Sequence, residues 1–305
     1  MKTVTFRVVG LGEVLWDLLP SGPQLGGAPA NFAYHAQALG ARAQVISRVG
    51  DDENGREGLR RLQTRGLDCS TIQHDESAPT GTVTVSLGEN GVPDFTIREN
   101  AAWDQIVATP EALAAVREAD AICFGTLAQR DPRSREALRT LVSAARASAL
   151  RILDLNLRPP HWQPETILWS ISGANVLKLN HEELATLAPM LQLSGDEREC
   201  VAQLGRRYGL VAVALTRGPR GSLLWTPSET VEHYGVAVEV RDTVGSGDAF
   251  TAALSLGLLA QWPLPKISDH ANAVAAFVCS QDGAMPTLPD SLQTRFLARA
   301  EPHIS

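Results

Sequence analysis

Cysteine is scarce in this sequence and is not arranged for metal binding or for a disulfide framework. The 305 residues include four cysteines, which lie far apart and form no CxxC pair: Cys69, Cys123, Cys200 and Cys279. Closely spaced cysteines are the signature of structural zinc sites and of small disulfide-linked domains. This pattern therefore favours a reducing compartment, and we expect a cytoplasmic location.

Long apolar runs are missing as well. One long stretch without a charge lies between Asp248 and Lys266, and it contains Gln261, Pro263 and Pro265. A membrane-spanning helix needs about 20 mostly apolar residues, so this stretch is too short and too polar. We therefore expect no attachment to a membrane.

An excess of basic charge is the third missing feature. Lys and Arg number 27 against 34 Asp and Glu, which gives a formal net charge of −7. Surfaces that hold nucleic acid or anionic lipid are rich in basic residues, so these partners are not expected. Near the N-terminus, Arg7 and Glu13 break the apolar run that a secretory leader requires.

Two common nucleotide-binding motifs are incomplete or lacking. Gly10-Leu11-Gly12 opens like a dinucleotide-binding fingerprint, but the third glycine and the helical pattern that should follow are missing. This excludes NAD binding there. The sequence also has no GxxxxGKS or GxxxxGKT segment, so an ATP-using protein of this sequence would not be a P-loop enzyme.

What the sequence does have is a regular alternation of short β-prone runs with helical patterns. This alternation is typical of a parallel sheet with crossover helices. The predicted strands are Val4–Gly10, Gln44–Val49, Ala121–Phe124, Arg151–Asp154, Asn175–Leu179 and Val211–Leu215. The predicted helices are Pro29–Leu39, Glu53–Arg65, Arg133–Ala147, Glu182–Leu187, Glu197–Tyr208, Asp248–Ala260 and Ile267–Ser280. We expect one doubly wound α/β domain over residues 1–305, with a mostly parallel sheet and helices on both faces.

Two segments depart from this alternation and predict antiparallel ribbons. They are Glu13–Leu25 and Thr80–Arg98, and the second contains Asn90-Gly91, a strong hairpin-turn signal. A small ribbon inserted into a large α/β domain resembles a lid over a cleft. We expect a β-sheet lid formed by about residues 13–25 and 80–100.

The strongest local motif is Gly245-Ser246-Gly247-Asp248, which leads into a helix rich in small residues. Backbone amides at such a helix start converge and can hold a phosphate. Asp248 has two interpretations. It can be an acidic cap of the helix, or it can be a carboxylate that takes the proton of a substrate hydroxyl.

A second glycine-rich segment lies near the other end of the chain. Gly26-Gly27-Ala28-Pro29-Ala30-Asn31 leads into a helix, and Asn31 offers both a donor and an acceptor to a hydroxyl. Taken together, the two segments resemble the two signature patterns of the ribokinase-like carbohydrate kinases, the PfkB family. The resemblance covers nearly the whole chain and implies a ribokinase-like fold.

Further segments are similar to the fructokinase branch of that family. The resemblance implies catalytic roles for Asp248 as general base and for the anion-hole residues Gly245, Ser246 and Gly247. It implies a sugar site made of Asp17, Gly26, Gly27, Asn31, Arg98 and Arg158. The sequence departs from the family pattern at Ser246, where alanine is usual, and at Trp103, where an acidic residue is common and Asp104 follows.

The resemblance also implies where ATP and its ions would bind. The nucleotide-binding residues would be Asn180, Glu183, Thr216, Gly218, Gly221 and Asn272. Magnesium would be reached through water, with Glu183 contributing. Potassium would lie near Asp242, Val244 and Gly283, although the segment around Gly283 follows the family's cation loop only loosely.

The most specific prediction is an ATP-dependent fructokinase that makes fructose 6-phosphate. From Leu11 to Tyr34 there is no Lys or Arg, which disfavours a phosphosugar because its dianion would need neutralising. Ribose, 2-keto-3-deoxygluconate and ribosides stay open as substrates, and Arg98 and Arg158 suit the carboxylate of ketodeoxygluconate. A non-catalytic sugar sensor is a more distant alternative. Relatives often pair through their lids, so we expect a homodimer.

Overall fold

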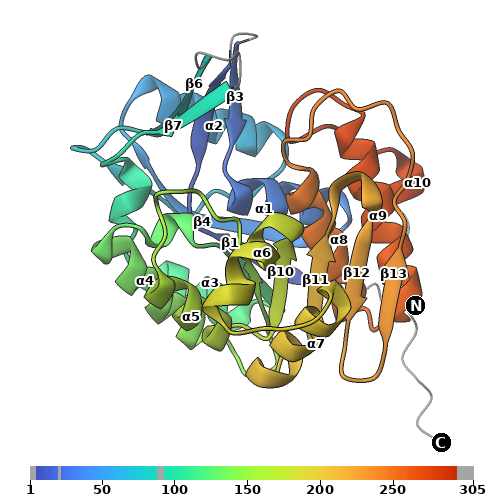
Figure 1. Ribbon diagram of the computed structural model, residues 1–305. Helices are drawn as coiled ribbons and strands as arrows, with labels where there is room; N and C mark the ends of the chain where they lie inside the picture. The colour runs from blue at the N-terminus through green and yellow to red at the C-terminus, as the bar shows by residue number, and fades with distance from the viewer. Residues whose placement is uncertain (1–4, 20–21, 88–92, 294–305) are drawn as a thin grey trace, which may run out of the picture.

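The computed structural model describes residues 5–19, 22–87 and 93–293 (Figure 1). Within them, a large nine-stranded sheet runs through the centre of the chain. Its strands, in spatial order, are β13 (Thr230–His233), β12 (Ser222–Trp225), β11 (Ala212–Thr216), β10 (Val176–Asn180), β9 (Leu150–Asp154), β8 (Ala121–Phe124), β1 (Arg7–Leu11), β4 (Arg42–Gly50) and β5 (Ile72–Asp75). All neighbouring strands are parallel except at one edge, where β11, β12 and β13 pair antiparallel.

Helices cover both faces of this sheet, as the sequence predicts (Figure 1). One face packs against α1 (Ala28–Ala38), α2 (Glu53–Thr64), α8 (Ser246–Leu259) and α9 (Leu264–Cys279). The other packs against α3 (Pro110–Glu118), α4 (Pro132–Ala144), α5 (Pro164–Gly173), α6 (His181–Met190) and α7 (Glu197–Tyr208). A short helix, α10 (Asp290–Gln293), follows. In the part of the chain that the structure describes, no helix is long and apolar enough to cross a membrane.

The predicted elements of the large sheet and its helices are all present, with ends that differ by a few residues. The bounds of β8 and α7 are those predicted. The predicted first strand began at Val4, which lies outside the described residues. Sequence reasoning missed β5, β12, β13, α3 and α5, although α3 and α5 each begin with a proline in the first turn, a helix-start signal.

A second sheet of four strands is formed by the two segments predicted as ribbons, and we call it the lid sheet. Its order is β3 (Gly22–Gly26), β2 (Leu15–Leu19), β6 (Gly81–Leu87) and β7 (Pro93–Ile97). Each ribbon is antiparallel, and a parallel pairing of β2 with β6 joins them. The expected turn at Asn90-Gly91 lies outside the described residues. The lid sheet stands at the end of the large sheet where its parallel strands finish (Figure 1).

Candidate active site

The site begins at the N-terminus of α8, where backbone geometry requires a glycine. Gly245 precedes the helix with φ 78°, a left-handed conformation that side chains other than glycine rarely adopt. A Cβ atom there would also lie 2.5 Å from the carbonyl oxygen of Ala284. The first amides of a helix have no partner within it, and they carry the positive end of the helix dipole. This turn therefore has the form of an anion-binding site.

Asp248 lies in the first turn of α8 and is partly buried. Its Oδ2 accepts a hydrogen bond of 2.8 Å from Nδ2 of Asn31, so the starts of α1 and α8 meet at this pair. Burial, helped by the nearby carboxylate of Asp154, raises the pKa of Asp248 to about 7, against the opposing effects of Asn31, Lys178 and Arg158. A carboxyl group with a pKa near neutrality is suited to exchanging protons with a hydroxyl.

The lid sheet adds a second carboxylate to the cleft. In β2, Nε1 of Trp16 donates to the backbone oxygen of Asn54 in α2 at 2.9 Å. Because side chains alternate between the two faces of a strand, Asp17 lies on the face away from α2. Burial raises the pKa of Asp17 to about 6, while Arg158 lowers it and Asp242 raises it further. A Cβ atom on Gly26 would lie 2.8 Å from Oδ2 of Asp17, and one on Gly27 would lie 2.3 Å from the backbone oxygen of Glu13. The absence of a side chain at both glycines therefore avoids a steric clash with the Asp17 carboxylate and with the lid backbone.

The two predicted sugar-binding arginines lie in different surroundings. Arg158 lowers the pKa values of Asp17 and Asp248, so its charge acts on the cleft carboxylates. The side chain of Arg98 is exposed at the end of β7, and its backbone oxygen accepts a hydrogen bond from Arg130. The described residues show no contact between the Arg98 side chain and these carboxylates.

The predicted nucleotide-binding residues gather at the ends of β10 and β11. Asn180 caps α6 by accepting from the backbone N–H of Glu183, whose Oε2 accepts from the backbone N–H of Asn180, each at 2.8 Å. The other carboxylate oxygen of Glu183 accepts from the backbone N–H of Leu157 at 2.8 Å. Glu183 therefore joins the end of β10 to the segment after β9. A carboxylate oxygen can accept more than one hydrogen bond, so contact with magnesium through water fits this arrangement.

Thr216 lies beside Asn180 in the register of β10 and β11. The turn that follows contains Gly218 and Gly221, both with positive φ. Asn272 of α9 is buried and donates from Nδ2 to Oγ of Ser222 at 2.7 Å, and Ser222 pairs with Thr216. Asn272 thus contacts the strand that follows this turn through Ser222.

The predicted cation loop is held together by one carboxylate. Asp242 accepts from the backbone N–H of Val244 at 2.9 Å and from that of Gly283 at 3.1 Å. This brings the segment before α8 against the segment after α9, where backbone carbonyl oxygens would be the ligands of a monovalent cation. Within residues 5–19, 22–87 and 93–293, no cluster of three His, Cys, Asp or Glu side chains could hold a metal ion.

Comparison with known proteins agrees with this geometry. Residues 23–291 match the family described as pfkB family carbohydrate kinase. The chain belongs to the pfkB family of carbohydrate kinases. Fructokinase of Escherichia coli is 30% identical to it over 300 residues, which cover 93% of this chain and 96% of that protein.

Solved pfkB structures have the same fold. An uncharacterized sugar kinase from Pyrococcus horikoshii, crystallised in complex with ATP, superposes with a TM-score of 0.77 at 28% identity and covers 91% of this chain and 94% of its own. Fructokinase from Vibrio cholerae, with fructose, ADP and calcium bound, superposes with a TM-score of 0.80 at 27% identity and covers 96% and 99%. The ribokinase-like fold predicted from the sequence is confirmed.

The departure from the pfkB pattern at Trp103 has a structural explanation. Trp103 is fully buried, and the guanidinium carbon of Arg130 lies 4.0 Å from the centre of its ring. The acidic residue that follows, Asp104, is also buried and forms an ion pair of 2.8 Å with Arg130. The tryptophan is therefore a core residue under the lid, and the acidic side chain one position later holds Arg130.

Sequence reasoning missed two buried charged residues near the pfkB site. Glu13 joins β1 to the lid sheet, and its Oε1 accepts from the backbone N–H of Ala28 at 3.3 Å. Lys178 lies inside β10 and forms an ion pair of 3.0 Å with Asp154. The sequence feature that could have identified them is a charged residue within an apolar run, because Lys, Glu and Asp are seldom fully buried without a partner.

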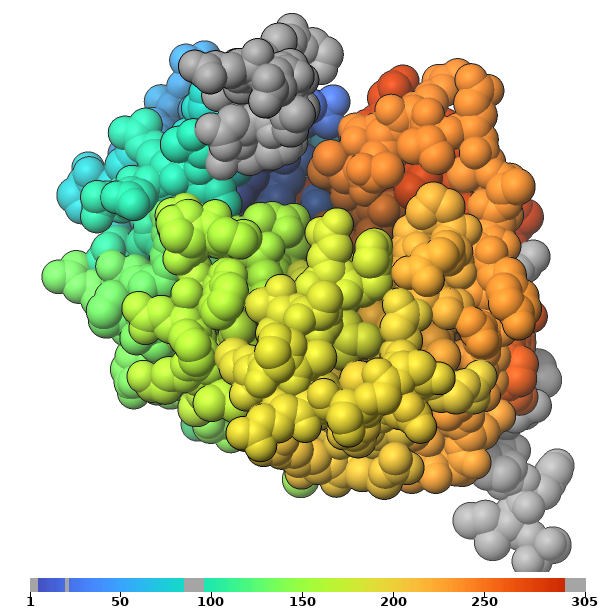
Figure 2. Space-filling view, viewed as in Figure 1, coloured from blue at the N-terminus to red at the C-terminus, as the bar shows by residue number. Residues whose placement is uncertain are grey.

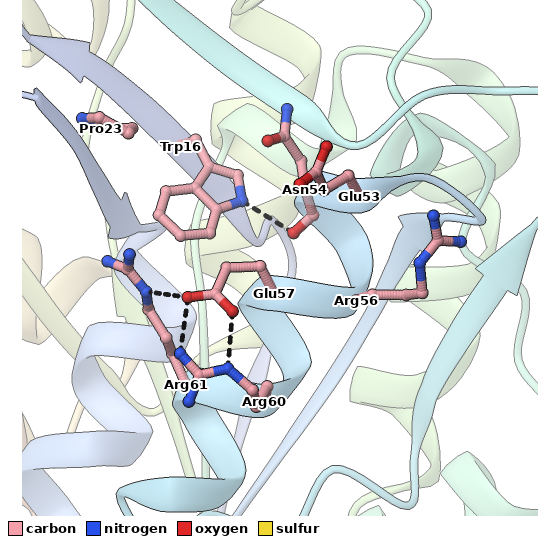
Figure 3. Close-up of a pocket in the computed structure, with 8 residues that line it drawn as sticks. All are labelled: Trp16, Pro23, Glu53, Asn54, Arg56, Glu57, Arg60 and Arg61. Carbon is pink, nitrogen blue, oxygen red and sulfur yellow. Dashed lines mark hydrogen bonds and ion pairs between the residues drawn. The ribbon is translucent and has the colours of Figure 1, made fainter.

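Two hollows in the surface differ in character. In the space-filling view, a hollow lies between the lid sheet and the orange segments that contain α8 and the cation loop (Figure 2). Another, of about 360 Å³, lies against Trp16 and α2 (Figure 3). There Glu57 accepts hydrogen bonds from both Arg60 and Arg61, so two guanidinium groups share one carboxylate. The first hollow is the one that carries the pfkB motifs.

Proposed function

We propose that this chain is an ATP-dependent sugar kinase that phosphorylates the primary hydroxyl of a free sugar, fructose before others, to give fructose 6-phosphate. The observation that carries the proposal is the hydrogen-bonded pair of Asp248 and Asn31 at the facing starts of α8 and α1. It combines a carboxyl group able to take a proton, an amide able to orient a hydroxyl, and a helix start able to hold a phosphoryl group. The fructose-bound relative from Vibrio cholerae supports the choice of sugar.

The chemistry follows from alignment and charge neutralisation, which dominate phosphoryl transfer. Asp248 takes the proton of the hydroxyl as its oxygen attacks the terminal phosphorus of ATP, and ADP leaves with the electrons of the broken phosphorus–oxygen bond. The backbone N–H groups of Gly245, Ser246 and Gly247 stabilise the charge on the oxygens of the transferred group. Asp17, Gly26, Gly27, Asn31, Arg98 and Arg158 hold the sugar.

The nucleotide lies along the turn that carries Thr216, Gly218 and Gly221, with Asn180 and Glu183 at its phosphates and Asn272 behind. Asn180 and Glu183 would hold magnesium through water, and it would supply charge neutralisation at the phosphates of ATP. Potassium would lie near Asp242, Val244 and Gly283. A homodimer paired through the lid sheets and a cytoplasmic location remain predictions from the sequence.

A sugar acid is the second candidate for the substrate. 2-Keto-3-deoxygluconate carries a carboxylate that a guanidinium can bind in a bidentate manner, and both Arg98 and Arg158 are exposed. Ribose and ribosides differ from fructose in a few hydroxyl contacts only. A coupled ADP-release assay with fructose, ribose, a riboside and ketodeoxygluconate ranks these substrates by kcat/KM. Absence of turnover with every sugar at millimolar ATP and magnesium would contradict the kinase proposal and favour a sugar sensor.

Asp248→Asn tests the proposed base. The substitution keeps size and hydrogen bonding but removes the proton acceptor, so kcat should fall by about 10²–10⁴-fold with sugar affinity nearly unchanged. In the unsubstituted protein, kcat/KM should fall on the acid side of about pH 7, where Asp248 becomes protonated. Asp196→Asn is the matched control, because Asp196 is an exposed aspartate that caps α7. If both variants retain most of the rate, Asp248 is not the base.

A further inference from the structure

A buried ion pair lies directly behind the candidate active site. Asp154 ends β9 and Lys178 lies in the neighbouring strand β10, where the two residues are partners in the register. Nζ of Lys178 is 3.0 Å from Oδ1 of Asp154, and the two residues are 7% and 4% exposed. They lie on the same face of the sheet as Ile152 and Val176, whose side chains belong to the core beneath α8.

Both members of the pair contact the start of α8. The hydroxyl of Thr251 donates to Oδ2 of Asp154 at 2.8 Å, which ties the second turn of the helix to β9. Nζ of Lys178 lies 3.0 Å from the position that a Cβ atom on Gly247 would occupy. The ammonium group therefore lies against the backbone of the anion-hole turn.

Stability alone does not account for this pair. Removing two charges from water costs free energy that their attraction often fails to repay, and apolar residues of similar size commonly do as well or better in a core. The neighbouring positions on the same face are Ile152 and Val176, so the site could hold apolar side chains. A role in the reaction explains why charges occupy it.

We propose that Lys178 and Asp154 are positioning residues for phosphoryl transfer, which as an ion pair anchor the first turns of α8 and set the charge around Asp248. This inference rests on the proposed function. Lys178 neutralises Asp154, which would otherwise stand as an unpaired carboxylate beside the base. Asp154 in turn holds Thr251, and with it the helix turn that presents the anion-hole amides.

The groups that face Asp248 come from every element around it. Asp154 raises the pKa of Asp248, Lys178 lowers it by less, and Arg158 after β9 lowers it as well. Cys123 of β8 is buried, and burial raises the pKa of its thiol well above the ordinary value, so it is neutral. From α1, Asn31 contributes an uncharged amide. Two of these three named charged groups therefore belong to the ion pair.

The test compares the pH profile of kcat/KM in three variants. Asp154→Asn leaves the ammonium of Lys178 unpaired near Asp248, so the midpoint of the acid side should move down by about one pH unit. Adding Lys178→Met to Asp154→Asn removes that ammonium, and the midpoint should return part of the way towards the wild-type value. Thr251→Val removes the hydrogen bond to Asp154 without changing any charge. We therefore expect kcat to fall and the midpoint to stay unchanged.

A second measurement separates this inference from the proposed function. The carboxyl ¹³C resonance of Asp248, assigned by its loss in Asp248→Asn, reports the protonation of this group in the protein without substrate. A wild-type chain that phosphorylates no sugar contradicts the proposed function, while the resonance still tests the charge around Asp248. If Asp154→Asn does not fold, the uncharged double variant replaces it, and its midpoint should still lie below that of the wild type. An unmoved or raised midpoint in a folded variant overturns the inference.

Discussion

Glu13 offers the sharpest quantitative test of the electrostatics around the cleft. It is 3% exposed at the junction between β1 and the lid sheet. Burial raises its pKa from the ordinary 4.5 to about 7, although backbone hydrogen bonds and the charges of Arg158 and Arg130 act in the opposite direction. Replacing Glu13 with Gln keeps the size of the side chain and an oxygen that accepts from Ala28, but removes the ionisation.

The pKa values of Glu13 in the folded and unfolded chain determine the sign and the size of the change in stability with pH. The folded chain binds the Glu13 proton more tightly than the unfolded chain does, so the stability of the fold decreases as pH rises from 4.5 to about 7. At about 1.4 kcal/mol for each pH unit, this loss reaches about 3 kcal/mol. Because Gln cannot ionise, Glu13→Gln should become more stable relative to wild type across this window by the same amount, and the difference should stay constant above it.

Urea unfolding from pH 4.5 to 8.5, followed by tryptophan fluorescence, measures this difference directly. The control is Glu57→Gln, the same chemical change at a half-buried carboxylate. Hydrogen bonds from Arg60 and Arg61 lower the pKa of Glu57 to about 2, so its contribution to stability is present above pH 4.5. That variant should be less stable than wild type at neutral pH. A difference for Glu13→Gln that does not change with pH would refute the reasoning.

Two glycine substitutions test the packing of the site. Gly245→Ala places a Cβ atom 2.5 Å from the Ala284 oxygen at φ 78°, so kcat should fall by at least tenfold, whereas Gly22→Ala, with a positive φ but open space around it, should leave kcat unchanged. Gly81→Ala places a Cβ atom 2.3 Å from Nε1 of Trp103, and thermal unfolding should show a loss of about 1–3 kcal/mol. Gly58→Ala in α2 meets only ordinary contacts and should be neutral or slightly stabilising; equal effects of Gly81→Ala and Gly58→Ala would contradict this account of the lid.

Local sequence patterns predicted the parts of the fold that local physics determines. Apolar runs marked β1, β4 and β8 to β11, because strands buried on both faces read as continuous apolar segments. The short strands β12 and β13 were not predicted, because a four-residue apolar run does not distinguish a strand from other structure without its pairing partner. Asp248 and Asn31 were found through their glycine-rich loops, but that they bond to each other is a result of the fold alone.

Lys178 and Glu13 could not be assigned from sequence for a related reason. A single charge in an apolar run gives no indication of its partner, and the partners here are 24 and 15 residues away, across a strand pairing and a helix start. Asp154 was predicted as the end of a strand, yet its hydrogen bond with Thr251 spans 97 residues. Such contacts depend on strand order, which local patterns do not determine.

The charge of Arg158 acts on three carboxyl groups around the cleft, and this effect supports the proposal of a neutral substrate. Burial is the main cause of the raised pKa in Glu13, Asp17 and Asp248, and Arg158 lowers all three. A sugar that carries a carboxylate or a phosphate would draw the guanidinium to itself. The pKa of Asp248 would then rise, and less of the base would be ionised at neutral pH. A free sugar would leave Arg158 with the carboxylates, and this supports the proposal of a neutral sugar such as fructose over a phosphosugar or a sugar acid.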